Sequence, residues 1–201
     1  MARTIIGITG KAGVGKSTVS FYLQQAYGFT RLAFADPVKG MLQVFLASQG
    51  LDAVTIQRML DGDLKEAPTP LFEGHDPRWA LQTLGTEWGR QKLGSNLWTH
   101  HLLSRLSSLD ADRIVVDDVR MDNEAEALRY SEWAHQTRIW EVHALGQQAR
   151  RHPHMHASEY GINELLVDAS IQHDFTMAEM QRVVDLKLAE LGIERKGPWH
   201  G

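Results

Sequence analysis

Cysteine is absent from this sequence of 201 residues. Disulfide bonds, zinc sites built on thiolates and cysteine nucleophiles are therefore excluded, and the composition is compatible with a cytoplasmic protein. Long hydrophobic runs are also missing, because no apolar stretch approaches the ~20 residues that a membrane-spanning helix needs. The first residues hold no signal-peptide hydrophobic segment. We expect a protein of the cytoplasm that has no membrane partner.

An excess of positive charge is missing as well. The chain has 21 Lys and Arg residues against 25 Asp and Glu residues, which gives a formal net charge of -4. A general nucleic-acid binder relies on a broad positive field, so we expect no stable binding to nucleic acid. Any anionic ligand must instead be held by local arginines, lysines and backbone amides. With 43% apolar residues, the chain can form one substantial core.

Strands and helices alternate along the sequence. Hydrophobic patterning predicts strands at 4–9, 29–35, 113–116, 137–142 and 169–172. It predicts helices after the glycine loop with a stop at Gly28, from 37, briefly within 50–76, and at 77–93, 96–107, from 123 and 176–191. This order indicates an α/β fold in which a mainly parallel sheet is covered on both faces. Ligands on such sheets bind beyond the carboxyl ends of the strands.

The strongest motif is "GITGKAGVGKST" at 7–18, directly after the first predicted strand. Gly10, Gly15, Lys16 and Ser17 satisfy the pattern G-x-x-x-x-G-K-[ST] in the strand, loop and helix context that it requires. Backbone N–H groups of such a loop turn inward around a polyphosphate, and the helix N-terminus adds partial positive charge. Lys16 then spans the outer phosphates, and Ser17 is a ligand for Mg²⁺.

A second anchor for the metal is expected at the end of a buried strand. Asp117 and Asp118 follow the predicted strand 113–116, and either could serve. Side chains alternate along a strand, so only one of the two can point into the site. A helix cap or a solvated turn is the structural alternative for these carboxylates.

The predicted helix 77–93 carries a second candidate anion site. Four polar residues lie four positions apart and so share one face of an α-helix: Arg78, Gln82, Thr86 and Arg90. Three apolar residues lie roughly opposite: Leu81, Leu84 and Trp88. Arginine forks bind phosphate, and the amide and hydroxyl could bind a base or a sugar. A solvated helix face is the alternative.

More arginines follow at positions where a phosphoryl group could be transferred. Arg120 lies two residues past Asp118, and Arg150 and Arg151 lie in an irregular segment, 143–163, that could act as a lid. The histidines at 152, 154 and 156 fit polar lid residues better than a zinc site. Several arginines without a dedicated base suit an acceptor that is already ionised, such as a phosphate monoester. The pattern therefore indicates a nucleotide kinase.

Six blocks occur in a familiar order: "ITGKAGVGKST", "FADPVKGML", "ALQTLGTEWGR", "NLW", "VVDDVRMDNEAEAL" and "HASEYGI". With them, the chain resembles the bacteriophage-type deoxynucleoside monophosphate kinases of the P-loop kinase superfamily. The resemblance implies ATP and Mg²⁺ as cofactors and a deoxynucleoside monophosphate as acceptor, and a homodimer is compatible with it. It also implies one three-layer P-loop kinase domain over 1–201. Its core is about 1–35, 108–142 and 164–192, its acceptor-binding helical region about 36–107, and its lid about 143–163.

The resemblance also implies roles for individual residues. ATP would contact the phosphate loop: Lys11, Ala12, Gly13, Val14, Gly15, Lys16, Ser17 and Thr18. The acceptor would contact eight residues: Asp36, Lys39, Arg78, Gln82, Thr86, Arg90, Trp98 and Arg120. Arg120 would bridge both phosphates, and Lys16, Arg150 and Arg151 would join it in catalysis. Ser17 and Asp118 would hold the metal, with Asp118 matching the family better than Asp117.

Alternatives stay open at this point. Asp36 could instead cap the helix that Pro37 opens, and Trp98 could pack in the core rather than support a base. A P-loop kinase acting on a hydroxyl, such as dephospho-coenzyme A or a modified base in DNA, would recruit Asp36 as its base. A nucleotide-dependent switch or motor is a different class; the absence of N-K-x-D and D-x-x-G motifs argues against a GTPase switch.

Overall fold

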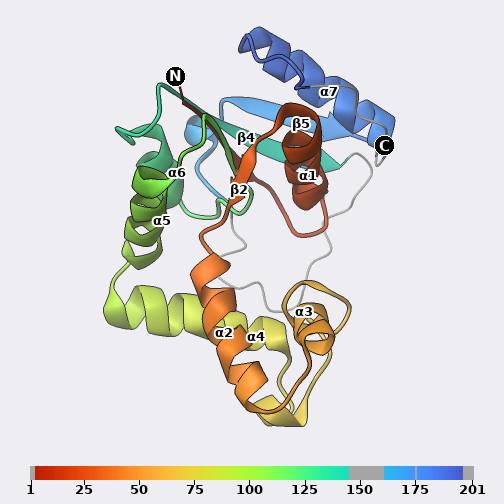
Figure 1. Cartoon of the computed structure of the whole chain (residues 1–201), viewed down its shortest axis with the longest axis vertical. Coiled ribbons are helices and arrows are strands. Elements are labelled where there is room, and N and C mark those ends of the chain that lie inside the picture. Colours follow the sequence, from red (N-terminus) through yellow and green to blue (C-terminus); the bar gives the residue numbers. More distant parts are fainter. Residues whose placement is uncertain (1–2, 145–160, 175, 197–201) are drawn as a thin grey trace. The chain divides into compact units, whose positions relative to one another are not determined.

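The computed structural model describes residues 3–144, 161–174 and 176–196 (Figure 1). The chain divides into two compact units. One unit consists of Met1–Ala33 together with His101–Gly201, and the other consists of Phe34–His100. Within the described ranges, no helix combines the length and the apolar character that a membrane crossing requires.

The first unit is built on a five-stranded sheet in which every pair is parallel. Its strands are β1 (Thr4–Thr9), β2 (Thr30–Leu32), β3 (Arg113–Val116), β4 (Gln136–Ala144) and β5 (Ala169–His173). They lie in the order β2-β3-β1-β4-β5, so β1 is central. All six residues of β1 are buried, as expected for a strand covered on both faces. The predicted α/β class with a parallel sheet is confirmed.

Three strands differ in length from the sequence prediction, and β5 does so by a single added residue, His173. The strand expected at 29–35 is reduced to Thr30–Leu32, because it pairs only with β3 over these three residues and the chain enters the second unit at Phe34. The strand expected at 137–142 extends over Gln136–Ala144, because β4 pairs with β1 along its first part and with β5 along its last. Hydrophobic patterning does not show how far a pairing partner reaches.

Helices cover both faces of this sheet, which gives three layers. Helices α1 (Lys16–Tyr27) and α7 (Met177–Glu190) pack with Ile6 and Ile8 of β1 in one core cluster. Gly7 faces the other way, because side chains alternate along a strand. A Cβ on Gly7 would touch Leu128 of α6 (Asp122–Arg129), so α6 lies close on that face.

The strand β1, the phosphate loop and α1 form one continuous unit of structure. α1 buries the apolar stripe expected from its sequence: Val19, Tyr22, Leu23 and Ala26. It ends at Gly28, whose φ of 67° is left-handed and whose N–H bonds to the carbonyls of the last turn, as the sequence predicts. Burial of this stripe against the sheet fixes the N-terminus of α1, and therefore Lys16 and Ser17, beyond the carboxyl end of β1.

The second unit is helical. It contains α2 (Asp36–Ser48), α3 (Ala53–Asp61), η1 (Pro70–Phe72), α4 (Pro77–Gln82), η2 (Thr83–Leu93) and the first four residues of α5 (Leu97–Ser108). Its core consists of six buried residues: Leu42, Leu46, Ile56, Met59, Leu60 and Ala80. Figure 1 shows α2 and α4 in this part of the chain.

The single α-helix predicted over 77–93 is wrong in its second half. The chain is α-helical only to Gln82, and η2 continues with the wider π-type winding, in which an N–H bonds five residues back. At its end, for example, the N–H of Gly94 donates to the carbonyl of Gly89 at 3.1 Å. Each residue of η2 therefore advances by less than the 100° of an α-helix. As a result Trp88, which we expected to pack, is 42% exposed.

Candidate functional site

The phosphate loop adopts a conformation that only glycine tolerates well. Gly15 has φ 95°, in the left-handed region, where it caps the N-terminus of α1. Gly10 has φ 131°, and a Cβ there would lie 2.5 Å from the carbonyl oxygen of Val142 in β4. The first glycine of the motif is thus required by the close approach of a neighbouring strand, and the second by the turn into the helix.

Lys16 lies against this loop. Its Nζ donates to the carbonyl oxygens of Gly10 and Lys11, at 2.8 and 2.7 Å. Ser17 is exposed in the first turn of α1, where unpaired N–H groups and the helix dipole favour an anion. The other predicted loop contacts, Ala12, Gly13, Val14 and Thr18, lie in the same segment. A lysine and an exposed hydroxyl at one helix N-terminus are the features that the predicted polyphosphate site requires.

Sequence reasoning missed His173, the last residue of β5. Its side chain is 5% exposed, and its Nε2 lies 2.9 Å from the carbonyl oxygen of Val14 in the phosphate loop. The pattern "ASIQ" predicts a strand that stops one residue before His173, and one histidine there carries no signal of what it contacts. The parallel pairing of β4 with β5 brings it to the same edge of the sheet as the loop.

A pocket of about 290 Å³ lies beside the loop. It is lined by Gly13, Gly15 and Thr18 on one side and by residues from β5 and the start of α7 on the other: His173, Thr176, Met177 and Met180. Thr176 is the N-cap of α7, and its side-chain oxygen accepts from the N–H of Glu179. The mixed apolar and polar lining is that of a small-molecule site.

The structure distinguishes the two carboxylates after β3. Asp117 accepts from Nε of Arg31 at 2.8 Å, and its side chain is only 9% exposed, so its carboxylate is engaged in an ion pair within the fold. The N–H of Val119 donates to the carbonyl of Ile8, which holds this turn against the end of β1 and next to the phosphate loop. Asp117 is thus held within the fold, and Asp118 as the second metal anchor stays the prediction that the family resemblance implies.

Arg120 lies in the same turn, between β3 and α6, and is exposed. Its backbone N–H donates to Oε2 of Glu124 at 2.8 Å, and the N–H of Met121 donates to the same oxygen at 3.1 Å. Glu124 is 1% exposed and was not singled out in the sequence. Its carboxylate fixes the backbone that carries Arg120. The sequence signature of a capping box has Ser or Thr at the N-cap, and Met121 stands there, so the sequence did not identify Glu124.

In the helical unit, two predicted acceptor residues are held by ion pairs. Nζ of Lys39 lies 2.5 Å from Asp61, and Arg78 lies 2.7 Å from Glu66. The carboxylates of both partners are more than 40% exposed, so these pairs are open to water and exchangeable. A phosphate dianion could therefore compete for either cation.

The other predicted acceptor residues are distributed over η2 and its neighbours. Gln82 is partly buried and Thr86 is 8% exposed. Nη1 of Arg90 lies 3.5 Å from the carbonyl of Gly85, which also accepts from Nε1 of Trp98 at 2.8 Å. Trp98 is 5% exposed, and its indole packs directly against Gly89 of η2. Asp36 is the first residue of α2, and Ala35 occupies the cap position that we considered for it.

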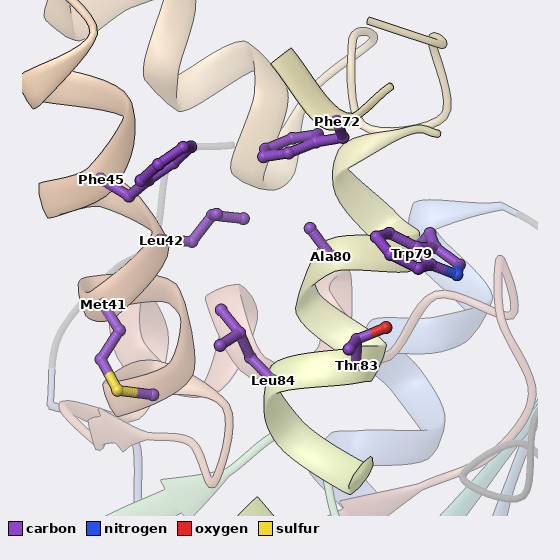
Figure 2. Close-up of a pocket in the computed structure, with 8 residues that line it drawn as sticks. All are labelled: Met41, Leu42, Phe45, Phe72, Trp79, Ala80, Thr83 and Leu84. Carbon is purple, nitrogen blue, oxygen red and sulfur yellow. The ribbon is translucent and has the colours of Figure 1, made fainter. Parts of the chain in front are cut away.

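Figure 2 shows a separate apolar pocket of about 310 Å³ in this unit. It is lined by Met41, Leu42 and Phe45 of α2, by Phe72, and by four residues of α4 and η2: Trp79, Ala80, Thr83 and Leu84. None of these residues belongs to the predicted acceptor set. The remaining candidates, Arg150 and Arg151, lie outside the described residues, as does most of the predicted lid, so their catalytic roles stay predictions.

A parallel sheet with a glycine-rich phosphate loop between its central strand and first helix defines a P-loop nucleotide-binding protein. Among curated proteins, one from Acanthamoeba polyphaga mimivirus, provisionally named deoxynucleotide monophosphate kinase, is 32% identical over 137 residues, or 62% of this chain and 68% of the relative. The chain therefore belongs to the deoxynucleoside monophosphate kinase family, as the sequence motifs predict.

Other comparisons are more limited. The deoxynucleoside-5'-monophosphate kinase of Escherichia phage T5 is 43% identical over 53 residues, which is 26% of this chain and 21% of that protein. TT1252 from Thermus thermophilus has a TM-score of 0.47 at 21% identity and covers 95% of this chain and 99% of its own. A gluconokinase from Sinorhizobium meliloti 1021 has a TM-score of 0.46 at 16% identity, over 94% and 93%. No family model matches the chain.

Proposed function

We propose that this protein transfers the γ-phosphoryl group of ATP to a deoxynucleoside monophosphate, giving a deoxynucleoside diphosphate and ADP. The observation that carries the proposal is the phosphate loop in a chain of this kinase family. Lys16 donates hydrogen bonds to two carbonyl oxygens of the loop, and Ser17 is exposed at the N-terminus of the following helix. A loop of this type binds the β- and γ-phosphates of the donor.

Mg²⁺ fits the residues at this edge of the sheet. A serine hydroxyl and an aspartate carboxylate are hard oxygen ligands of the kind that Mg²⁺ prefers, with waters completing its shell. Ser17 and Asp118 would supply them, since the carboxylate of Asp117 is bonded to Arg31. When bound, the ion neutralises charge on the phosphate oxygens.

The pocket beside the loop suits the nucleoside of the donor. Its lining begins at Gly13 and Thr18 and continues to Met177 and Met180, so a nucleotide held by its phosphates in the loop could place its base between them. Thioether side chains adapt to flat aromatic rings. The site would therefore bind ATP through the phosphates first and the base second.

For the acceptor, the proposal uses the helical unit. Arg78 and Arg90 would bind the phosphate, and Gln82 and Thr86 the sugar or base, with Trp98 supporting η2 from beneath. Asp36 and Lys39 lie at the start of α2 and would border the same ligand. The exposed pairs of Lys39 with Asp61 and of Arg78 with Glu66 hold these cations until a dianion displaces the carboxylates.

No general base is needed in this reaction. The acceptor phosphate is largely ionised at neutral pH, because its second pKa is about 6. What the protein supplies is alignment of the two phosphates and positive charge where charge develops, from Lys16 and Arg120. A kinase acting on a hydroxyl would need a carboxylate to accept the proton, and Asp36 would have to serve.

A coupled assay for ADP, run over the four deoxynucleoside monophosphates, their ribose counterparts and alcohol acceptors, tests the proposal. We expect turnover of at least one deoxynucleoside monophosphate, and Lys16→Ala to lower kcat/KM by at least about a thousandfold. Lys187→Ala, on the surface of α7 in the same unit, is the matched control. Turnover of alcohols alone, or ATP hydrolysis that ignores every acceptor, would refute the proposal.

The two aspartates provide a sharper test of the metal site. Asp118→Asn should lower activity at least about a hundredfold and raise the Mg²⁺ concentration needed for half-maximal rate. Asp117→Asn should instead lower the free energy of unfolding by about 1–3 kcal/mol, because Arg31 loses a partly buried partner. If Asp117→Asn alone changed the Mg²⁺ dependence, the assignment would be reversed.

A further inference from the structure

His173 stands out among the buried polar groups because it contacts the phosphate loop from another strand. Its imidazole is 5% exposed, and Nε2 lies 2.9 Å from the carbonyl oxygen of Val14. A carbonyl oxygen only accepts hydrogen bonds, so Nε2 carries a hydrogen and donates it. The bond joins residues 159 positions apart in the chain.

The bonded carbonyl belongs to the peptide unit that enters Gly15. In a trans peptide the C=O of one residue and the N–H of the next point to opposite sides of one plane. A donor that holds the oxygen of Val14 therefore also fixes the direction of the N–H of Gly15. That N–H belongs to the set from which a phosphate loop builds its anion site.

The ring of His173 also sets the space beside Gly15. A Cβ on Gly15 would lie 3.2 Å from Nε2 and 3.4 Å from Cε1 of the imidazole. The left-handed φ of 95° and this close approach act together, so the glycine and the histidine form one packed unit. Rotation of the Val14–Gly15 peptide would break the hydrogen bond and move the residue that precedes Lys16.

We propose that His173 is a positioning residue of the phosphate loop, and that its hydrogen bond to the carbonyl of Val14 orients the Gly15 N–H toward the polyphosphate of the donor. The inference rests on the proposed function of this loop as the ATP site. His173 acts through the loop and takes no part in the transfer itself. Its effect must therefore appear with any ligand that fills the loop with phosphates, whether or not the ligand has a base.

Two amide variants separate the hydrogen bond from simple packing. His173→Gln keeps a donor at nearly the reach of Nε2, whereas the side chain of His173→Asn is too short to reach the carbonyl of Val14. We expect the Asn variant to raise the Kd of Mg-ATP and of Mg-tripolyphosphate about tenfold each, and the Gln variant to stay within about threefold of the parent. Calorimetry without any acceptor measures both constants.

Steady-state kinetics give an independent readout. The Asn variant should raise KM for ATP while KM for the acceptor at saturating ATP stays unchanged. Ile171→Val serves as the control, because Ile171 is fully buried in the same strand and the change removes one methyl group of packing but no hydrogen bond. It should lower the melting temperature and leave both dissociation constants as they are. Titrations are run well below each variant's melting temperature.

The outcomes that overturn the inference are distinct. Equal losses in the Gln and Asn variants would show that the hydrogen bond is not the cause. A loss for ATP without a loss for tripolyphosphate would place His173 on the nucleoside instead. Normal binding by the Asn variant would leave only a structural role. If the parent bound Mg-ATP and tripolyphosphate but phosphorylated no deoxynucleoside monophosphate, the proposed function would fail while this measurement stood.

Discussion

The phosphate loop and the helix α4–η2 were both predicted from short patterns, and only the first adopts the expected conformation. In the loop, the residues that define the motif also impose the backbone, since Gly10 and Gly15 have φ angles that other residues avoid. In α4–η2, the pattern assumes 100° per residue, and the chain departs from it after Gln82. A pattern is reliable when its own residues create the geometry.

A residue outside the helix packs against the part that departs from the pattern. Gly85 and Gly89 are buried, and the indole of Trp98 lies over Gly89 and donates to the carbonyl of Gly85. The wider winding buries Thr86 and exposes Trp88, the reverse of what an α-helix would do. Tertiary packing thus overrides the local periodicity. Gly85 and Gly89 offer little resistance, because glycine is a weak α-helix former.

The largest effect is expected where glycine creates the geometry. Gly15→Ala forces a side chain into the left-handed region, at about 1–2 kcal/mol, and presses its Cβ against His173. We expect kcat/KM for ATP to fall at least about a hundredfold. Gly28→Ala is the matched control, because Gly28 is left-handed at the other end of α1 and its Cβ would meet only the flexible side chain of Lys196.

Both variants should lose similar stability, measured by denaturant unfolding, while only Gly15→Ala loses ATP turnover. If Gly28→Ala lost turnover to the same degree, general destabilisation of α1 would explain both results. The role that we assign to the loop glycine would then have no support.

A smaller effect is expected where glycine only makes room. The Cβ of Gly89→Ala would overlap the indole of Trp98, which should cost about 1–3 kcal/mol of overpacking. Gly85→Ala has nothing closer than Val38 at 3.9 Å, and alanine is the better helix former by about 1 kcal/mol, so its stability should stay equal or rise. Thermal unfolding distinguishes the two.

Gly89→Ala and Gly85→Ala should also differ in their KM for the acceptor. Gly89→Ala should raise KM for the deoxynucleoside monophosphate about tenfold, since Arg90 follows it directly, and leave KM for ATP unchanged. Identical acceptor kinetics in the two variants would show that Trp98 does not govern this helix face.

Most of the sheet could be predicted from sequence, since buried strands such as 4–9 and 113–116 are short apolar runs with clear ends. The stripe of α1 and its stop at Gly28 follow from periodicity and from glycine's left-handed preference. Of the candidate site, the sequence could predict only the residues that belong to its motif. Lys16 and Ser17 lie where the spacing puts them, because the loop is local in sequence.

What sequence could not supply are contacts between distant segments. His173 reaches Val14 across 159 positions, and Arg31 reaches Asp117 across 86. Neither pair has a spacing rule, because each depends on which strands become neighbours in the sheet. The second contact shows that Asp117 is engaged within the fold, which alternation along a strand does not predict.

The smallest effect is expected at the contact of α1 with α7, away from the phosphate loop. The hydroxyls of Tyr22 and Tyr27 in α1 each donate to Oδ1 of Asp185 in α7 at 2.6 Å. Burial, and then this hydrogen bond, raise the pKa of both tyrosines above the usual 10. As pH rises through about 10, the unfolded chain loses protons that the folded chain keeps, so the free energy of unfolding should fall. Tyr22→Phe with Tyr27→Phe should show a shallower fall in melting temperature between about pH 9 and 11. Parallel melting curves would mean that these hydroxyls do not couple α1 to α7, and that the phosphate end alone fixes the helix.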